Sequence, residues 1–167
     1  MAVALVAKTK TDKVPLLAIV LAAYGSDVLK IGFKAIGLEQ NGSGYVNIKR
    51  GINISIPANI PWSHGLLMTV VWSALAAVIV YLFYQDRRSA GIFGLVVISH
   101  WFLDVLVHSP ELPLLFTGSP LVGLGLWSTL QGRVIASFLE VGMLVGGLAL
   151  YLIHRKRRAV SVDKKKE

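Results

Sequence analysis

The sequence predicts an all-α membrane protein, a bundle of about four transmembrane helices with a re-entrant or interfacial segment on the outer side. The 167 residues are 54% hydrophobic and only 16% charged, with a mean hydropathy of +0.65, whereas average chains are roughly 45–50% apolar and about 25% charged. The apolar residues gather in four stretches, each close to the roughly 20 residues that a spanning helix needs. The 17 basic residues lie mostly between and beyond these stretches. Because a nucleic-acid-binding protein needs basic side chains spread over a soluble fold, no nucleic-acid partner is expected.

The first predicted helix covers about residues 14–38 and has two different halves. Its first half is purely apolar, and its second half carries Asp27, Lys30 and Lys34. The basic residues before it and the small residues near Gly25 also suit a secretory signal peptide. The helical pattern continues through Gly25 without a break, which favours a spanning helix.

The other three helices are predicted at about 65–84, 89–108 and 134–153. The second has no ionisable residue other than tyrosine and needs no functional explanation. His100 and Asp104 interrupt the third, and Glu140 is the only charge in the fourth. Residues 1–153 are therefore expected to form one transmembrane domain, followed by a basic cytoplasmic tail at 154–167.

The distribution of basic residues predicts the orientation. With four crossings, the N-terminus, the 85–90 loop and the C-terminus lie on one side and carry 12 of the 17 basic residues, against three on the other side. This imbalance predicts a multi-pass protein of the bacterial inner membrane with both termini in the cytoplasm. The basic tail is better explained as an anchor against anionic membrane lipids than as a nucleic-acid-binding segment.

Two connecting segments are expected on the outer side. Residues 39–63 are polar and contain YVNIKRGINISI, which suggests a small hairpin. Residues 109–133 contain three prolines, several glycines and a tryptophan. This second segment is too apolar for a free loop and too broken for a spanning helix, so it is expected to cover the outer end of the bundle.

The ionisable residues within the apolar stretches are the candidate functional residues, because a charge at membrane depth costs at least ~2.5–3.5 kcal/mol. His100, Asp104 and His108 are spaced four apart and lie on one helix face. An imidazole and a carboxylate at this spacing can bind one cation. A buried His–Asp hydrogen bond has the same spacing and stays open as an alternative. Since the chain has no cysteine, any metal must be held by His, Asp or Glu.

Three more ionisable residues are expected at the same membrane depth as His100, Asp104 and His108. His64 stands at the outer start of the second helix, Glu140 lies about two turns into the fourth, and Asp27 lies in the first. Residues of four helices are thus expected in the outer half, which is a composition typical of a metal site. Lys30 and Lys34 leave two alternatives open. They could form a salt-bridged stripe with Asp27, or line a cavity that attracts an anionic head group.

These motifs resemble a family of bacterial multi-pass proteins described as membrane-bound metal-dependent hydrolases. The resemblance covers most of residues 20–153, and its specific parts are PWSHGLL and SHWFLDVLVHSPELPL. Positions that match the family pattern are Ser63, His64, Ser99, His100, Trp101, Asp104, His108, Pro110, Leu112 and Pro113. The family's carboxylates in its first and last helices align with Asp27 and Glu140. Gly65 in place of serine, Glu111 in place of aspartate, and Lys30 and Lys34 in a normally apolar helix depart from the pattern.

The resemblance and the residues together predict a metal-dependent hydrolase that acts on a lipid-like or phosphoester substrate at the outer leaflet. The expected metal is a divalent ion, with zinc first, held by His64, His100 and Asp104, then by His108 and Asp27. Glu140 would accept a hydrogen bond from a ligating histidine or act as a general base. The alternative is a non-catalytic accessory subunit of a larger membrane protein complex, in which the same cluster is a hydrogen-bond network between helices. Ion conduction is disfavoured because no ionisable residue lies in the inner half of any predicted helix.

Overall fold

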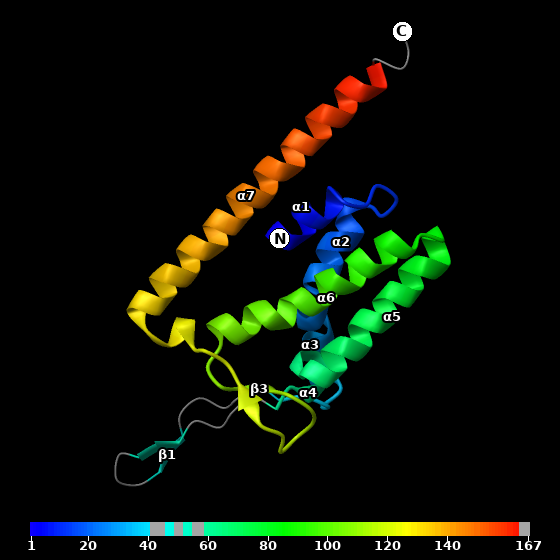
Figure 1. Ribbon diagram of the computed structural model, residues 1–167. Coiled ribbons are helices and arrows are strands. Elements are labelled where there is room, and N and C mark those ends of the chain that lie inside the picture. Colours follow the sequence, from blue (N-terminus) through cyan, green and yellow to red (C-terminus); the bar gives the residue numbers. More distant parts are fainter. Residues whose placement is uncertain (41–45, 49–51, 55–58, 164–167) are drawn as a thin grey trace.

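The computed structural model describes residues 1–40, 46–48, 52–54 and 59–163, and it is mostly helical (Figure 1). Its helices are α1 (Ala2–Lys8), α2 (Leu16–Ala23), α3 (Gly25–Ala35), α4 (Pro61–His64), α5 (Leu66–Tyr84), α6 (Arg87–Val107) and α7 (Leu130–Asp163). A 3₁₀ turn, η1, covers Leu126–Ser128, and the four short strands are β1 (Val46–Ile48), β2 (Ile52–Ile54), β3 (Leu112–Pro113) and β4 (Leu121–Val122). The chain is therefore mostly helical, as the sequence predicts, with two short strand pairs in addition.

Three of the described helices, α5, α6 and α7, are long and apolar enough to cross a membrane. The pair α2 and α3 makes a fourth candidate if the two count as one bent span. Helices α5 and α6 match the predicted second and third stretches to within two residues at each end. This arrangement of three to four apolar helices is compatible with a membrane protein.

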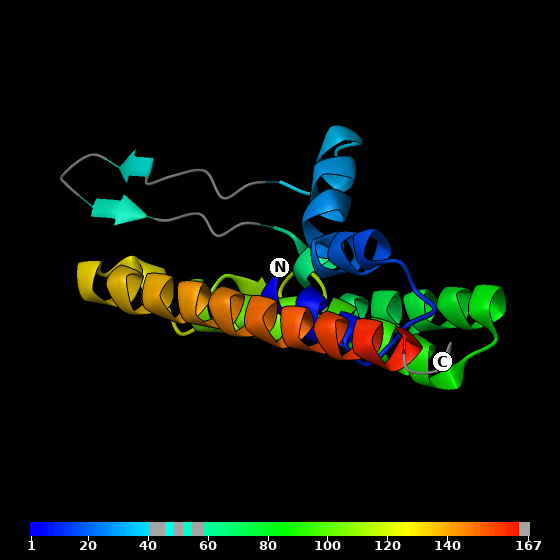
Figure 2. The same ribbon diagram turned by 90° about the horizontal axis from the view of Figure 1, so that it is seen from above.

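Helices α5 and α6 form an antiparallel hairpin that is the main body of the fold (Figures 1 and 2). The helices approach closely at Gly94, whose missing side chain leaves room for Ser73, and the Ser73 hydroxyl donates a 2.7 Å hydrogen bond to the Gly94 carbonyl. Large apolar side chains such as Phe83, which is 80% exposed, point away from the hairpin. Such faces suit contact with lipid, where close packing of small residues and hydrogen bonds hold helices together.

The first predicted helix is not continuous, and this prediction was wrong. The chain bends by 58° between α2 and α3, at Tyr24, and α3 projects out of the layer that contains α5, α6 and α7 (Figure 2). Gly25 and Ser26 follow the bend, and Gly/Ser pairs are among the usual causes of sharp helix kinks. The break places Asp27 in the first turn of α3 and leaves the last carbonyl groups of α2 without helical partners.

An additional helix, α1, was not predicted. It packs against α7 and α2, with Ala4 fully buried and Ala7 nearly so. Isolated helices of this length are marginal in water, so local sequence gives little signal for them. Tertiary contacts stabilise α1 and place it between α7 and the rest of the fold (Figure 1).

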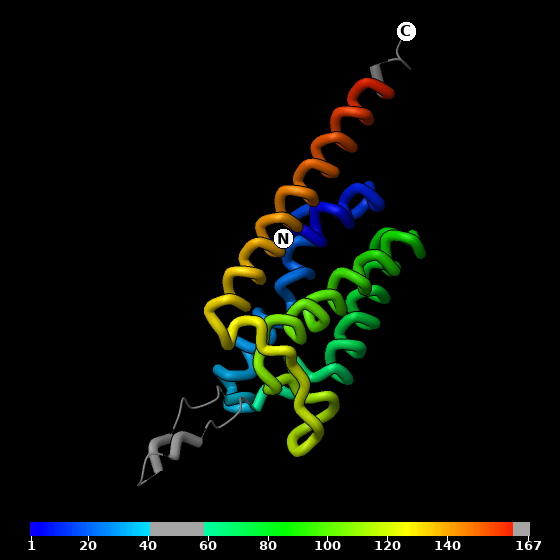
Figure 3. Tube along the Cα trace, turned by 60° about the vertical axis from the view of Figure 1, so that its left-hand side comes forward, coloured from blue at the N-terminus to red at the C-terminus, as the bar shows by residue number. Residues whose placement is uncertain are grey.

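Helix α7 is longer than predicted. It does not end near Ile153 but continues as one helix to Asp163, and its C-terminal part extends beyond the other helices (Figure 3). Asp12 lies against this extension, where its carboxylate pairs with Arg158 and stands 4.0 Å from His154. The first part of the predicted basic tail is thus helical.

Each of the two connecting segments contains a short antiparallel pair of strands. Strands β1 and β2 pair antiparallel, with Val46 opposite Ile54, which confirms the small hairpin; the turn between them lies outside the described residues. In the second segment, β3 pairs with β4, and Leu67 at the start of α5 donates to the Leu114 carbonyl at 3.0 Å. This segment is therefore attached to the α4–α5 end of the hairpin.

Asp86 caps α6, and its protonation is expected to destabilise the protein. Its carboxylate accepts a 3.0 Å hydrogen bond from the Ser89 backbone N–H, and the Ser89 side chain together with this N–H lowers the pKa of Asp86. The capping contribution is therefore fully present above the ordinary aspartate pKa of about 3.9, and is lost as the pH falls from there through the lowered value. We expect wild type to unfold at a higher temperature than Asp86→Asn in detergent above this pH, with the difference shrinking in acid. A difference independent of pH would contradict this assignment.

Candidate metal centre

Four side chains from three helices meet at one end of the α5–α6 hairpin. Asp27 comes from α3, His64 from the short helix α4, and His100 and Asp104 from successive turns of α6. His64 Nε2 lies 3.5 Å from Asp27 Oδ1 and 3.5 Å from Asp104 Oδ2. His100 Nε2 lies 3.6 Å from Asp27 Oδ2 and 3.3 Å from Asp104 Oδ2. We call these four residues the His/Asp cluster.

His100 is oriented by the break between α2 and α3. Its Nδ1 lies 2.9 Å from the carbonyl oxygen of Ala23, the last residue of α2. Because a carbonyl oxygen can only accept, Nδ1 of His100 carries the proton and donates it to Ala23. In the neutral ring, the lone pair is then on Nε2, which faces the two carboxylates. The kink thus supplies the hydrogen bond that turns this histidine toward the cluster.

His64 is held by its neighbours on both sides. Its side chain is 4% exposed, and its Nδ1 lies 2.7 Å from the hydroxyl oxygen of Ser63. The Ser63 hydroxyl and backbone N–H each donate a 2.7 Å hydrogen bond to the Glu39 carboxylate. The Trp101 indole N–H donates to the His64 carbonyl at 2.9 Å. Glu39 was not predicted as part of the site, because it lies 24 residues from Ser63 along the chain and no local pattern connects the two.

The geometry of the cluster fits a metal ion. Asp27, His64 and His100 each offer a ligand atom, and these atoms lie within 4.8 Å of one another. In a tetrahedral site with metal–ligand bonds of about 2.0–2.1 Å, neighbouring ligand atoms stand roughly 3.3–3.4 Å apart. The four nitrogen–oxygen distances of the cluster, 3.3 to 3.6 Å, are close to this spacing.

Asp104 supplies the second sign of a cation site. Its Oδ2 is buried, and within the described part of the chain it has no hydrogen-bond partner. The two imidazole Nε2 atoms are near it but not in hydrogen-bonding geometry. A buried polar atom without a partner is costly, and a cation between the two nitrogens and the carboxylates would satisfy it. Asp104 is therefore a candidate fourth ligand.

His108 is a predicted ligand that lies outside this group. It follows α6 directly, its Nδ1 is 2.8 Å from Glu111 Oε1, and its ring packs near Trp127 with ring centroids 5.2 Å apart.

The described structure does not have the salt-bridged stripe that Lys30 and Lys34 could have formed with Asp27. Among the residues that the structure describes, neither lysine forms an ion pair with Asp27, whose carboxylate faces the histidines instead.

Glu140 does not have the hydrogen-bonding role expected for it. The Nδ1 atoms of the two clustered histidines are occupied by Ala23 and Ser63. Glu140 instead lies in the wall of a cavity of about 500 Å³ between α1, α6 and α7, which His100 and Asp104 also line. Because Glu140 lines the same cavity as His100 and Asp104, its expected role as a general base stays a prediction.

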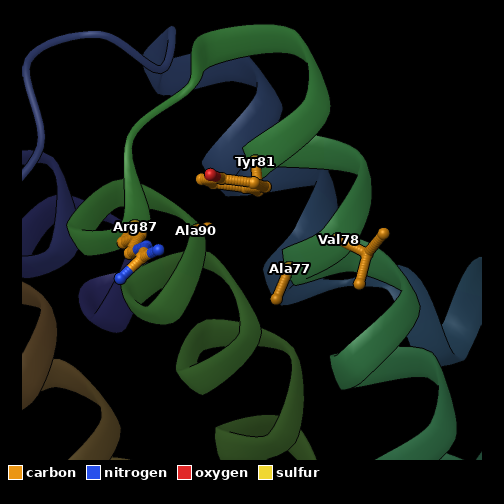
Figure 4. Close-up of a pocket in the computed structure, with 5 residues that line it drawn as sticks. All are labelled: Ala77, Val78, Tyr81, Arg87 and Ala90. Carbon is orange, nitrogen blue, oxygen red and sulfur yellow. The ribbon is translucent and has the colours of Figure 1, made fainter.

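The cavity is mainly apolar, with a few polar side chains in its wall, among them Ser99, His100, Asp104 and Glu140. Its apolar side chains come from α1, α2, α6 and α7 and from η1, and they include Leu103, Val107, Leu126, Leu139, Met143 and Leu144. A smaller hollow of about 320 Å³ lies elsewhere on the α5–α6 hairpin (Figure 4). Its walls, made by Ala77, Val78, Tyr81, Arg87 and Ala90, carry no metal-ligating carboxylate or imidazole. The large cavity is therefore the one that adjoins the candidate metal centre.

No protein-family model, curated protein or solved structure matches this chain. The resemblance to membrane-bound metal-dependent hydrolases consequently depends on the residue pattern alone.

Proposed function

We propose that this protein is a membrane-embedded, metal-dependent hydrolase that acts on a lipid-like substrate with a phosphoester or acyl bond. The observation that carries the proposal is the buried Asp104 Oδ2, which lacks a hydrogen-bond partner in the described structure and faces two imidazole Nε2 atoms at 3.3 and 3.5 Å. A metal ion between the side chains would satisfy this oxygen, which in the accessory-subunit alternative would pair with imidazole N–H groups instead. His64, His100, Asp27 and Asp104 are the proposed ligands.

The donor set favours zinc among the divalent metals. Imidazole nitrogen and carboxylate oxygen are both common zinc ligands, and the spacing fits a tetrahedral site. When bound, with one carboxylate giving up its position to water, such a metal would lower the pKa of that water to about 7 and make it a nucleophile at neutral pH. Asp27, whose side chain is 49% exposed, is the most accessible of the proposed ligands and is the one that water or substrate reaches most easily.

The cavity supports the substrate class. Ligand sites are commonly concave, mostly apolar and about 300–1,000 Å³ in volume, with a few polar groups that orient the ligand. The cavity of about 500 Å³ combines apolar walls with His100, Asp104 and Glu140. An alkyl chain would contact the apolar walls while its ester group lies near the cluster. Glu140 is the proposed general base, because it lines the same cavity as the two proposed ligands.

The proposed location is the bacterial inner membrane, with both termini in the cytoplasm and the metal centre toward the outer leaflet. This orientation follows from the 12 basic residues on the side of the termini. Membrane lipids are then both the surroundings and the source of substrate.

Metal content and hydrolysis of the purified protein test this proposal. We expect one zinc per chain by elemental analysis, and faster cleavage of p-nitrophenyl palmitate than of p-nitrophenyl acetate, because the longer chain fills the cavity. Bis(p-nitrophenyl) phosphate tests the phosphoester alternative. Glu140→Gln is expected to keep the metal and lose most of the hydrolysis. Wild-type protein without stoichiometric metal would rule the proposal out. A metal-free cluster in a protein that co-purifies with a defined partner would instead support the accessory-subunit alternative.

A further inference from the structure

We propose that Glu39 is a positioning residue that acts on His64 through the hydroxyl group of Ser63. Glu39 fixes the tautomer of His64 so that the proton is on Nδ1 and the lone pair of Nε2 points at Asp27 and Asp104. The consequence for metal affinity rests on the proposed function, whereas the tautomer itself is a property of the metal-free protein.

The tautomer of His64 follows from which atoms donate in the hydrogen bonds that connect Glu39, Ser63 and His64. A serine hydroxyl has one proton, and Ser63 donates it to Glu39 Oε2 at 2.7 Å. The same hydroxyl oxygen lies 2.7 Å from His64 Nδ1 and has no second proton to donate. Nδ1 must therefore be the donor in this contact. Nε2, at 3.5 Å from both carboxylates, keeps its lone pair and is available as a ligand.

The turn that ends α3 explains how the Glu39 carboxylate comes to lie beside Ser63. Gly37 has the left-handed value φ = 78°, and its N–H and that of Leu38 donate to the carbonyls of Lys34 and Phe33. This is the Schellman pattern, which ends a helix and turns the chain. Two residues after Gly37, Glu39 is only 2% exposed, and its two carboxylate oxygens accept from the hydroxyl and the backbone N–H of Ser63. The turn thus directs a buried carboxylate at the residue before His64.

The two histidines of the cluster are oriented by different kinds of group. His100 donates to a backbone carbonyl, which a side-chain substitution does not remove. His64 depends on the side chains of Ser63 and Glu39. Outer partners of this kind set the ring orientation and tautomer of metal-ligating histidines, and their loss typically costs 10–100-fold in metal affinity. Glu39 is therefore the position at which the tautomer can be changed without touching a ligand.

Glu39→Gln tests the proposal with little change of volume. The amide oxygen can still accept from the Ser63 backbone N–H, while the amide N–H₂ now donates to the Ser63 hydroxyl. That hydroxyl is then free to donate to His64 Nδ1, and the proton of the imidazole moves to Nε2. We expect long-range ¹H–¹⁵N spectra of histidine-labelled, metal-free protein at about pH 9 to show Nδ1–H for His64 in wild type and Nε2–H in the variant. Zinc affinity, measured by competition with a chromogenic chelator, is expected to fall about 10–100-fold.

Two further variants make the result specific. Ser63→Ala keeps the backbone bond to Glu39 but removes the hydroxyl, so we expect a mixture of His64 tautomers and a loss of zinc affinity in the same direction. Glu111→Gln is the matched control, because Glu111 contacts the Nδ1 of His108 directly, at 2.8 Å, outside the His/Asp cluster. It is expected to change the spectrum of His108 and to leave His64 and the zinc affinity unchanged.

The spectra and the affinities separate failure of this inference from failure of the proposed function. Nε2–H for His64 in wild type, or an unchanged tautomer in Glu39→Gln, would overturn the inference. An unchanged zinc affinity in a Glu39→Gln variant with a switched tautomer would overturn its consequence for the metal. If wild type binds no zinc but shows the expected tautomer switch, the proposed function fails and the role of Glu39 stands.

Discussion

Asp104→Asn is expected to abolish tight zinc binding and to raise the unfolding temperature of the metal-free protein. The two effects have one cause. In the metal-free cluster with neutral imidazoles, two Nε2 lone pairs face the carboxylates of Asp27 and Asp104, so that acceptors meet acceptors. The amide of Asp104→Asn supplies N–H donors to this group and removes one negative charge. The same change replaces a charged ligand by one that zinc binds poorly.

The size of the stabilisation can be estimated from one new hydrogen bond. A net gain of about 0.5–1.5 kcal/mol is typical, and each 1 kcal/mol shifts the unfolding temperature by about 2–4 °C in a chain of this size. We expect a rise of a few degrees in detergent with chelator present, measured at about pH 9, well above the ordinary histidine pKa of about 6.5. Zinc affinity is expected to fall by more than the 10–100-fold that loss of an outer partner costs.

The same measurement distinguishes the two functional alternatives. If the cluster is a network in which histidine donates to carboxylate, Asp104→Asn removes an acceptor and lowers the unfolding temperature. Asp12→Asn is the matched control, since Asp12 pairs with Arg158, a true donor, and its side chain is 54% exposed. It is expected to leave zinc binding unchanged and to change stability by no more than about 1 kcal/mol in the destabilising direction. A lowered unfolding temperature for both variants would contradict the metal centre.

Gly65→Ser is expected to weaken metal binding although Gly65 is not itself a proposed ligand. Gly65 joins α4 to α5 and follows His64 directly. A Cβ at this position would lie 2.3 Å from the Pro61 carbonyl oxygen and 2.9 Å from that of Leu115. Backbone atoms on both sides cannot give way like a flexible side chain, so α4 has to move and His64 moves with it. Overpacking of this kind typically costs about 1–3 kcal/mol.

The measurements are again the unfolding temperature and the zinc affinity, and both are expected to fall. Gly91→Ser is the matched control, because Gly91 is exposed in α6 and an added Cβ meets nothing within 4 Å. Serine has a higher helix propensity than glycine, so this control is expected to be neutral or slightly stabilising. Wild-type zinc affinity in Gly65→Ser would show that the α4–α5 junction does not position His64.

Much of the fold could be predicted because it depends on local patterns. The apolar runs of α5 and α6 have the length of a spanning helix, and the structure has them at the predicted places. The hairpin of β1 and β2 followed from alternation around a turn. The first helix could not be predicted correctly, because hydropathy does not register the bend at Tyr24. The helix α1 was missed because its stability comes from contacts with α2 and α7.

Part of the candidate site could also be predicted, because it too depends on a local pattern of the sequence. His100 and Asp104 are four residues apart on one helix, so their shared face follows from helical periodicity. Asp27 and His64, expected at the same membrane depth as these two residues, lie 3.6 Å from His100 and 3.5 Å from Asp104, respectively. Sequence spacing could not distinguish His108, which continues the same pattern but pairs with Glu111 after the helix has ended.

The sequence by itself determined the apolar helices, their approximate ends and the residue types available to bind a metal, because each depends on composition or on a period of a few residues. Only the tertiary structure decided which residues meet. It brings the Ala23 carbonyl to His100 and the Glu39 carboxylate to Ser63. These contacts join residues far apart in the chain, and they arise from a kink and a helix-ending turn that set directions in space. The physical reason is that a metal site needs lone pairs to converge on one point, and convergence is a property of the packed helices.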